Sequence, residues 1–154
     1  MDPCGTLGDA LKFAMEFERS AFVLYAEFAE RLDSEARPVL RRLAADSKAH
    51  VALLQRHADG AELEQKLSPA GAAWLAAQDC YRSISLPELT PESIEDDLLT
   101  YAEVRERLDY DFYSNMARLV PTGALHQVFV GLRDAKQRRE GEVRSCCAAL
   151  FLIF

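Results

Sequence analysis

Two glutamates lie among apolar residues at helical spacing, where a charged side chain is unusual. Glu18 is on the apolar stripe of one segment and Glu106 on that of another, and each is followed seven residues later by a tyrosine, Tyr25 or Tyr113. A carboxylate facing a helical core needs a cation, a metal ion or a proton, because an unpaired buried charge is too costly. The alternative is that both helices are rotated and both glutamates are solvated. The equal spacing in the two segments favours a pair of interior acids.

The segments that carry these acids have the periodicity of amphipathic helices. Apolar residues recur at three- and four-residue intervals, which predicts helices near 6–33 and 34–59, with Ser34 as the N-cap of the second. Thr90-Pro91-Glu92 has the composition of a third helix start, and Pro121-Thr122-Gly123 ends that helix. A fourth helix follows through Val143. No segment alternates like a strand.

Residues 60–90 differ from the rest, since glycines and prolines surround a short apolar piece near 72–77 that contains Trp74. We therefore expect a long crossover with a short extra helix between two helical hairpins. With 154 residues, 49% of them apolar, the chain is long enough for one domain with its own core. The prediction is an all-α four-helix bundle forming a single domain over residues 1–154.

The two halves of the chain also match each other weakly. A shift of 88 positions superposes four residues of the first predicted helix on the third, and a shift of 89 superposes two of the second on the fourth. The matched pairs are Ala14 and Ala102, Glu18 and Glu106, Tyr25 and Tyr113, Ala29 and Ala117, Val39 and Val128, and Leu43 and Leu132.

The paired Glu-x6-Tyr pattern, the long crossover and the internal repeat resemble the rubrerythrin family of the ferritin-like superfamily. Residues 14–25 resemble the first helix of that family and residues 43–50 the second. The resemblance implies a ferritin-like bundle around a di-iron site. In such a site the first and third helices each give one glutamate, and the second and fourth each give a Glu-x-x-His pair.

Carried over to this chain, the resemblance places Glu18, His50 and Glu106 at metal-ligand positions. Ser47 stands where the glutamate of the second helix belongs. When the fourth helix is aligned through Leu132, its motif reads Lys136-x-x-Arg139. Half of the ligand set is retained, and both bridging carboxylates are lost.

The replacements suggest that protein cations take the electrostatic role of the irons. Lys136 and Arg139 would balance Glu18 and Glu106 without any metal, and Asp109 would add a third acid that a protonated His50 balances. A slip of one residue in the fourth helix would instead turn Gln137 and Glu140 inward, and Glu140 would then be a possible ligand.

Some candidates also have a purely structural interpretation. A lone histidine such as His50 is more often hydrogen-bonded or solvated than a ligand. Tyr25 and Tyr113 are expected to be core residues whose hydroxyls reach a carboxylate or a backbone group.

Three functions follow from these patterns. The first is a rubrerythrin-like protein with a decayed di-iron site, a non-enzymatic binding or scaffold protein without a cofactor. The second is a protein that holds one iron, zinc or manganese ion through Glu18, His50 and Glu106, with Asp109 or Glu140, in iron handling or oxidative-stress defence. An enzyme of this kind would be a di-iron-type oxidoreductase. The third is an interaction module that uses the apolar residues 150–154 and the Trp74 segment.

Composition excludes several other classes. The net charge of −7 and the mixed charges argue against a nucleic-acid partner. The four cysteines form no Cys-x-x-Cys pair, so the rubredoxin module of many rubrerythrins is absent. The apolar C-terminus is far shorter than the about 20 residues of a membrane span. A cytoplasmic location is expected without a signal peptide, and a homodimer is expected from the resemblance.

Overall fold

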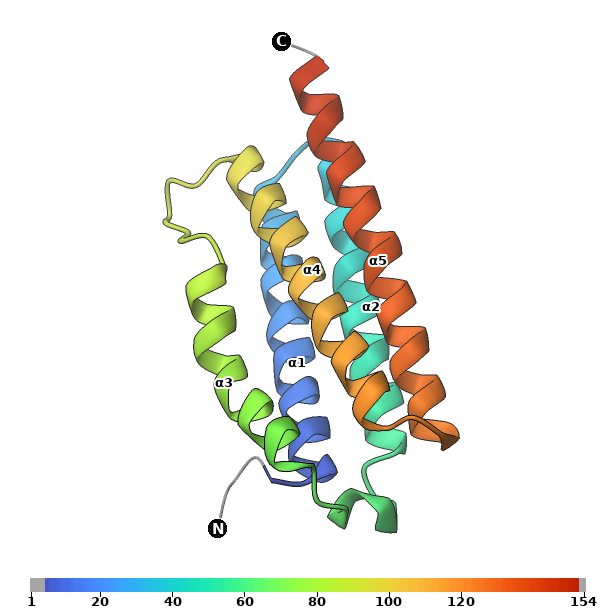
Figure 1. The fold of residues 1–154 in the computed structure, drawn as a ribbon. Coiled ribbons are helices and arrows are strands. Elements are labelled where there is room, and N and C mark those ends of the chain that lie inside the picture. Colours follow the sequence, from blue (N-terminus) through green and yellow to red (C-terminus); the bar gives the residue numbers. More distant parts are fainter. Residues whose placement is uncertain (1–4, 153–154) are drawn as a thin grey trace.

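The computed structural model describes residues 5–152, and the side chains of all of these except residues 61, 151 and 152. The described residues form five α-helices and a short 3-10 helix, η1, which confirms the predicted all-α class. Figure 1 shows their arrangement. The helices are α1 (Leu7–Arg31), α2 (Ala36–Arg56), α3 (Pro69–Ser85), α4 (Glu95–Leu119) and α5 (Gly123–Leu152), and η1 is Ala61–Glu64.

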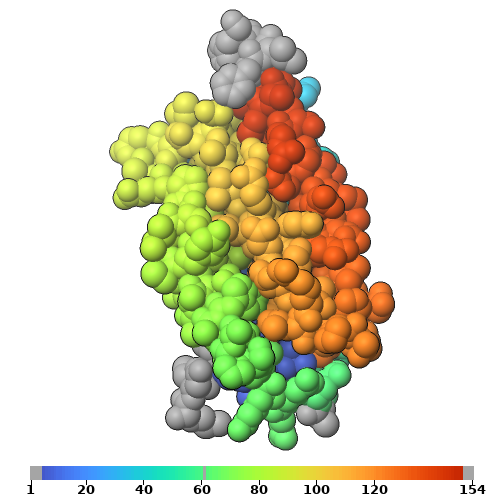
Figure 2. Space-filling view, in the orientation of Figure 1, coloured from blue at the N-terminus to red at the C-terminus, as the bar shows by residue number. Residues whose placement is uncertain are grey.

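Two helical hairpins make up the body of the molecule, as expected. α1 packs along α2, and α4 packs along α5. The crossover between the hairpins contains η1, which contacts α1, and α3, which contacts α4. In the space-filling view, α3 covers one side of the molecule, and the C-terminal turns of α5 project beyond the start of α4 (Figure 2).

The first helix begins where its sequence dictates. Thr6 Oγ1 accepts a hydrogen bond from the Asp9 amide at 3.1 Å, and the Asp9 carboxylate accepts one from the Thr6 amide at 3.0 Å. This reciprocal capping box satisfies two amides that would otherwise lack a helical partner. In the connection after α1, Ser34 Oγ accepts from the amide of Ala36 at 3.1 Å, but the N-cap of α2 is Glu35, so the prediction of Ser34 as N-cap is wrong by one residue.

Two other predicted boundaries are wrong. The crossover helix has 17 residues rather than a few, because Ser68 caps it through the Gly71 amide and Pro69 suits its first turn. α4 begins at Glu95 rather than at Thr90-Pro91-Glu92. There the Thr90 amide donates to Ser93 Oγ, and the Asp97 carboxylate accepts from the Ile94 amide, so the helix starts one turn later.

The interior consists of two apolar clusters separated by a polar layer. On α1 the first cluster extends to Phe17 and the second begins at Ala21, so that Glu18 lies between them. The same change of cluster occurs on α2, α4 and α5, where the intervening buried or half-buried residues include Ser47, His50, Glu106, Asp109 and Lys136. Four helices therefore each contribute polar side chains at the same level of the bundle.

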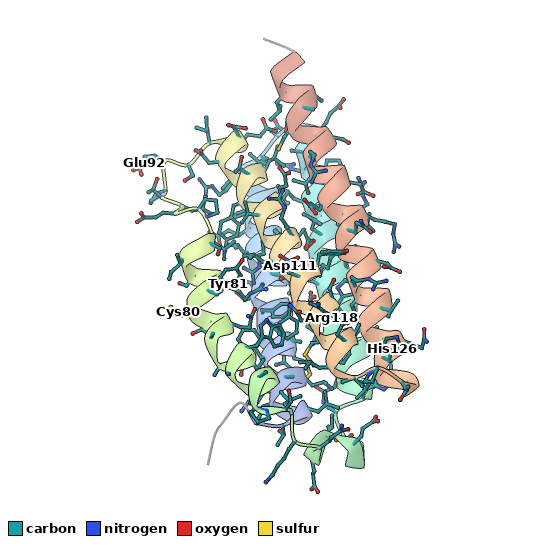
Figure 3. All side chains as sticks on the ribbon, viewed as in Figure 1. Cys80, Tyr81, Glu92, Asp111, Arg118 and His126 are labelled. Carbon is teal, nitrogen blue, oxygen red and sulfur yellow. The ribbon has the colours of Figure 1, made fainter. Side chains whose placement is uncertain are left out.

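The described residues of the two apolar segments predicted as interaction surfaces lie outside this layer, as does the thiol of Cys80. Trp74 stacks on Phe112 with ring centroids 5.2 Å apart, so it covers the core of its own chain. Leu150 packs against the second apolar cluster, while residues 153–154 of the proposed interaction tail lie outside the described residues. Cys80 and Tyr81 are exposed on α3 (Figure 3). Within residues 5–152, no helix combines the length and hydrophobicity that crossing a membrane requires.

Candidate functional site

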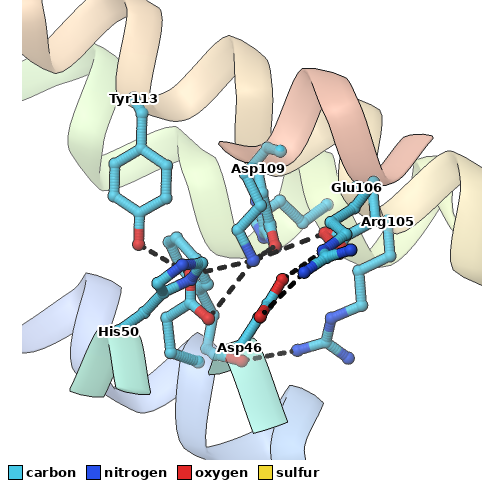
Figure 4. Close-up of polar contacts among 11 residues, drawn as sticks. Asp46, His50, Arg105, Glu106, Asp109 and Tyr113 are labelled. Carbon is cyan, nitrogen blue, oxygen red and sulfur yellow. Dashed lines mark hydrogen bonds and ion pairs between the residues drawn. The ribbon is translucent and has the colours of Figure 1, made fainter. Parts of the chain in front are cut away.

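The ammonium group of Lys136 is the centre of the polar layer. To this layer α2 contributes His50, and α4 contributes Glu106 and Asp109 (Figure 4). Lys136 Nζ lies 2.9 Å from Glu18 Oε1, 3.0 Å from Asp109 Oδ2 and 3.3 Å from Glu106 Oε2. All four side chains are at most 1% exposed. A single cation from α5 therefore meets one acid from α1 and two from α4.

Glu18 has the fullest set of partners among the three acids. Tyr113 donates its hydroxyl to Glu18 Oε1 at 2.8 Å, and Lys136 donates to Oε2 at 3.2 Å. His50 Nδ1 lies 3.4 Å from Glu18 Oε1 and approaches it from α2. Both carboxylate oxygens are thus engaged by donors from other helices.

Asp109 is held by a second cation, Arg82 of the crossover helix. Arg82 Nη2 hydrogen-bonds to Asp109 Oδ1, and its guanidinium lies over the Phe17 ring at 4.3 Å from the centroid. Arg105, one turn before Asp109, is also buried, and its Nη2 donates to the Phe17 carbonyl at 2.8 Å. The crossover thus reaches into the layer and adds a charge to it.

The environment divides the acids by protonation state. Burial raises the pKa of Glu106 to about 8; Asp109 and Glu18 add to this effect, and Lys136 only partly opposes it. Burial also tends to raise the pKa of Glu18 and of Asp109, but nearby cations outweigh it. Lys136 and His50 lower the pKa of Glu18, and Lys136 and Arg82 lower that of Asp109. Glu106 therefore carries a proton at neutral pH while the other two are ionised.

Lys136 itself stays charged. Burial alone would lower the pKa of its ammonium group, but the surrounding carboxyls of Glu106, Glu18 and Asp109 raise it above its ordinary value. At neutral pH the charges of Lys136 and Arg82 then balance those of Glu18 and Asp109. The tyrosines of the layer stay neutral too, because burial raises the pKa of Tyr25 and of Tyr113 well above the usual value.

Most of the residues singled out in the sequence come together. Glu18, His50, Glu106 and Asp109 gather around Lys136, so the two glutamates face the interior. Ser47 is fully buried in the same layer, and its hydroxyl has no hydrogen-bond partner among the described residues.

The expectation that Arg139 joins this cluster is wrong. Its guanidinium is partly exposed and pairs with Asp46 of α2 and with Glu142, at 2.9 Å from Glu142 Oε1. The side chain is long enough to reach these surface acids, where a charge keeps much of its hydration, so burial would bring it no advantage.

The register of α5 agrees with the alignment through Leu132 rather than with the slipped one. Lys136 points inward and Gln137 is exposed. Glu140 is buried at the edge of the layer, where Arg107 Nε lies 3.1 Å from its carboxylate and Arg144 donates a second contact. Glu140 Oε1 therefore contacts two arginines rather than Lys136.

The sequence interpretation missed Arg82 and Arg105. Arg82 continues the buried stripe of Gly71, Leu75 and Gln78 along α3, with helical spacing throughout. Arg105 lies on the buried stripe of α4 between Ala102 and Asp109. Periodicity would have marked both positions as interior, but an arginine on a stripe is easily assigned to a helix edge, where its charge reaches water.

These residues do not fit a di-iron centre. Such a centre needs carboxylates that bridge two ions, and here Ser47 and Lys136 stand in two of the expected glutamate positions. The Lys136 ammonium occupies the space among the oxygens of the remaining acids, and it cannot ligate a metal while it is protonated. Within residues 5–152, no three His, Cys, Asp or Glu side chains are grouped as metal ligands.

The chain was compared with family models, with curated proteins and with solved structures, and none of the three comparisons finds a match.

Proposed function

We propose that this chain is a ferritin-like bundle resembling the rubrerythrins, in which a lysine takes the place of the metal centre. It serves as a non-enzymatic binding or scaffold protein. The main support for this proposal is that Lys136 Nζ lies within 3.3 Å of three buried carboxyl groups. In a di-iron protein the cations attract the carboxylates of four helices, and here a cation attached to the chain does the same.

The arrangement of the helices supports this proposal. Each hairpin contributes one interior glutamate from its first helix, and a long crossover joins the hairpins. The polar layer lies between two apolar clusters, the usual level of an internal ion site in a helical bundle. A charged layer of this kind adds little stability over apolar packing, but it specifies which helices meet and in which register.

Elemental analysis of protein purified without chelators tests the proposal. We expect far less than one equivalent of iron, zinc or manganese per chain. One equivalent would overturn it in favour of the alternative, a single ion held by Glu18, His50 and Glu106 after displacement of Lys136.

A designed variant provides the positive control. Lys136→Glu removes the cation and adds a carboxylate among Glu18, Glu106 and Asp109, so we expect it to take up a divalent ion and to unfold at a higher temperature when iron or manganese is added. Lys12→Glu, a change at an exposed position on α1, should do neither. A folded Lys136→Glu protein that gains no metal would show that the layer is not a former metal site.

A scaffold requires a partner, and we propose a second copy of the chain in a cytoplasmic homodimer. An open groove of about 900 Å³ between α2 and α5 provides apolar surface near the C-terminus, lined by residues such as Val39, Cys146 and Leu150. Deletion of residues 151–154, which leaves Leu150 in the groove, followed by measurement of the molar mass in solution, separates this from the alternative of a tail-dependent interaction module. A dimer that survives the deletion does not depend on the tail.

A further inference from the structure

A second cavity, of about 340 Å³, opens between α1, α3 and α4, beside the polar layer. Its wall combines apolar and aromatic surface from Phe13, Phe17 and Leu86 with two arginines, Arg82 and Arg105. The volume suits a small organic molecule.

The two arginines are unusual because they are buried and incompletely satisfied. Arg82 is 6% exposed and Arg105 is 5% exposed. Within the part of the chain that the structure describes, Arg82 Nη1 and Arg105 Nε are buried without a hydrogen-bond partner. A buried donor that lacks a partner is costly, so a ligand oxygen that reaches either group would be bound favourably.

Arg105 has no acid of residues 5–152 in ion-pair contact. Burial acts to lower the pKa of Arg105 and the charge of Asp109 raises it, but Asp109 is already paired with Arg82 and Lys136. The Arg105 guanidinium donates to the Phe17 carbonyl at 2.8 Å and to the Tyr101 hydroxyl at 3.3 Å. A buried guanidinium that shares its acid with two other cations is only partly compensated, and an anionic ligand in the cavity would supply the missing contact.

We propose that this cavity binds a small organic monocarboxylate. The carboxylate pairs with Arg105, and the apolar part of the ligand packs against Phe13, Phe17 and Leu86. A guanidinium matches the planar geometry of a carboxylate, and the bonds it forms are charge-assisted. Glu16 and Asp79, which are exposed where they line the same cavity, disfavour ligands with a second negative charge.

Titration of the full chain with benzoate, followed by NMR or calorimetry, tests the proposal. We expect saturable binding of benzoate, and binding of benzamide, its uncharged analogue, at least about tenfold weaker, the effect of losing one charge-assisted contact. Inorganic phosphate should bind more weakly than benzoate. Equal binding of benzamide, stronger binding of phosphate, or no saturable benzoate binding would each overturn the proposal.

Variants locate the site. Arg105→Gln should weaken benzoate binding at least about tenfold, whereas Arg138→Gln, on the exposed surface of α5, should leave it unchanged. If Arg105→Gln does not fold, Ser83→Trp is the alternative variant. Ser83 is an exposed residue that lines the cavity, so a tryptophan there fills the cavity without altering an arginine and should abolish benzoate binding. Undiminished binding by folded Arg105→Gln or by Ser83→Trp would show that the ligand binds elsewhere. The result is independent of metal content, so each proposal fails or stands by its own measurement.

Discussion

The two halves of the chain carry the same pair of residues, a glutamate followed by a tyrosine, and use them differently. Glu18 in the first half accepts the hydroxyl of Tyr113 and a hydrogen bond from Lys136, and it contacts His50. Glu106 in the second half lies 3.3 Å from Lys136, and its Oε2 has no hydrogen bond from any described residue. The two tyrosines differ in the same way: the Tyr113 hydroxyl donates to Glu18, whereas the buried Tyr25 hydroxyl has no hydrogen-bond partner in residues 5–152.

This comparison shows that partners, rather than residue type, decide the charge of a buried acid. Both glutamates are completely buried, and burial acts on both in the same direction. The pKa of Glu18 is nevertheless lowered, while that of Glu106 is raised to about 8. A single lysine cannot neutralise three acids, and the least well-bonded acid keeps its proton.

Removal of the shared cation should destabilise both halves of the polar layer, and so abolish the difference between the two glutamates. Lys136→Met leaves Glu18 and Asp109 without their common partner, and we expect a loss of about 3–5 kcal/mol in the free energy of unfolding. Denaturant unfolding at neutral pH measures it. Lys12→Met, at an exposed position, is the matched control and should change little. A loss as small as that of the control would contradict the central role of Lys136.

Replacing each of the two glutamates with glutamine should change the free energy of unfolding by different amounts in the two halves. Glu18→Gln removes an ionised group paired with Lys136 and should cost about 3 kcal/mol. Glu106→Gln replaces a group that is uncharged in the folded protein at neutral pH but ionised in the unfolded chain, so it should stabilise the protein at neutral pH rather than destabilise it. Equal losses in the two variants, measured by denaturant unfolding, would mean that both glutamates have the same charge state.

The pH dependence of stability should carry the signature of Glu106. Its pKa in the folded protein, about 8, exceeds the ordinary value of 4.5, so between these limits the folded state binds a proton that the unfolded state does not. The stabilisation that this proton provides is fully present below pH 4.5 and is gone above about pH 8. Between these values the free energy of unfolding decreases by at most about 1.4 kcal/mol for each pH unit.

The Glu106→Gln variant isolates this effect. Subtracting its unfolding free energy from that of the wild type, across the window from weakly acidic to weakly alkaline pH, should give a difference that declines as the pH rises. Glu18 and Asp109, whose pKa values are lowered, lose their contribution only as the pH falls below the ordinary carboxyl range, in both proteins alike. A flat difference would show that Glu106 is ionised throughout.

The tyrosines should give the smallest contrast. Tyr113→Phe removes a hydroxyl that donates to an ionised carboxylate and should cost about 1.5 kcal/mol. Tyr25→Phe removes a buried hydroxyl for which the described residues provide no partner, so it should be neutral or slightly stabilising. Thermal unfolding of the two variants side by side measures the difference, and a reversed order would mean that Tyr25, rather than Tyr113, supports the polar layer.

Periodicity was sufficient to predict α1 and α2, the two hairpins, and the inward orientation of Glu18 and Glu106, whereas Lys136 was assigned to the interior only by the alignment of the fourth helix through Leu132. The features that periodicity predicted depend on neighbours within one or two helical turns. The length of α3 and the start of α4 were predicted wrongly. Ser68 caps α3 ahead of the apolar piece near 72–77, and the bond from the Ile94 amide to Asp97 starts α4 one turn after Thr90-Pro91-Glu92.

The sequence by itself determined that two acids, one in each half of the chain, would be buried among apolar residues. Only the tertiary structure decided which cations join them in the polar layer. Arg82 arrives from a helix of the crossover, and Arg139 turns outward to Asp46. It also decided which acid keeps its proton. Charge and hydrogen bonding in a buried layer depend on distances of about 3 Å between groups that are far apart in the chain, and no local pattern specifies those distances.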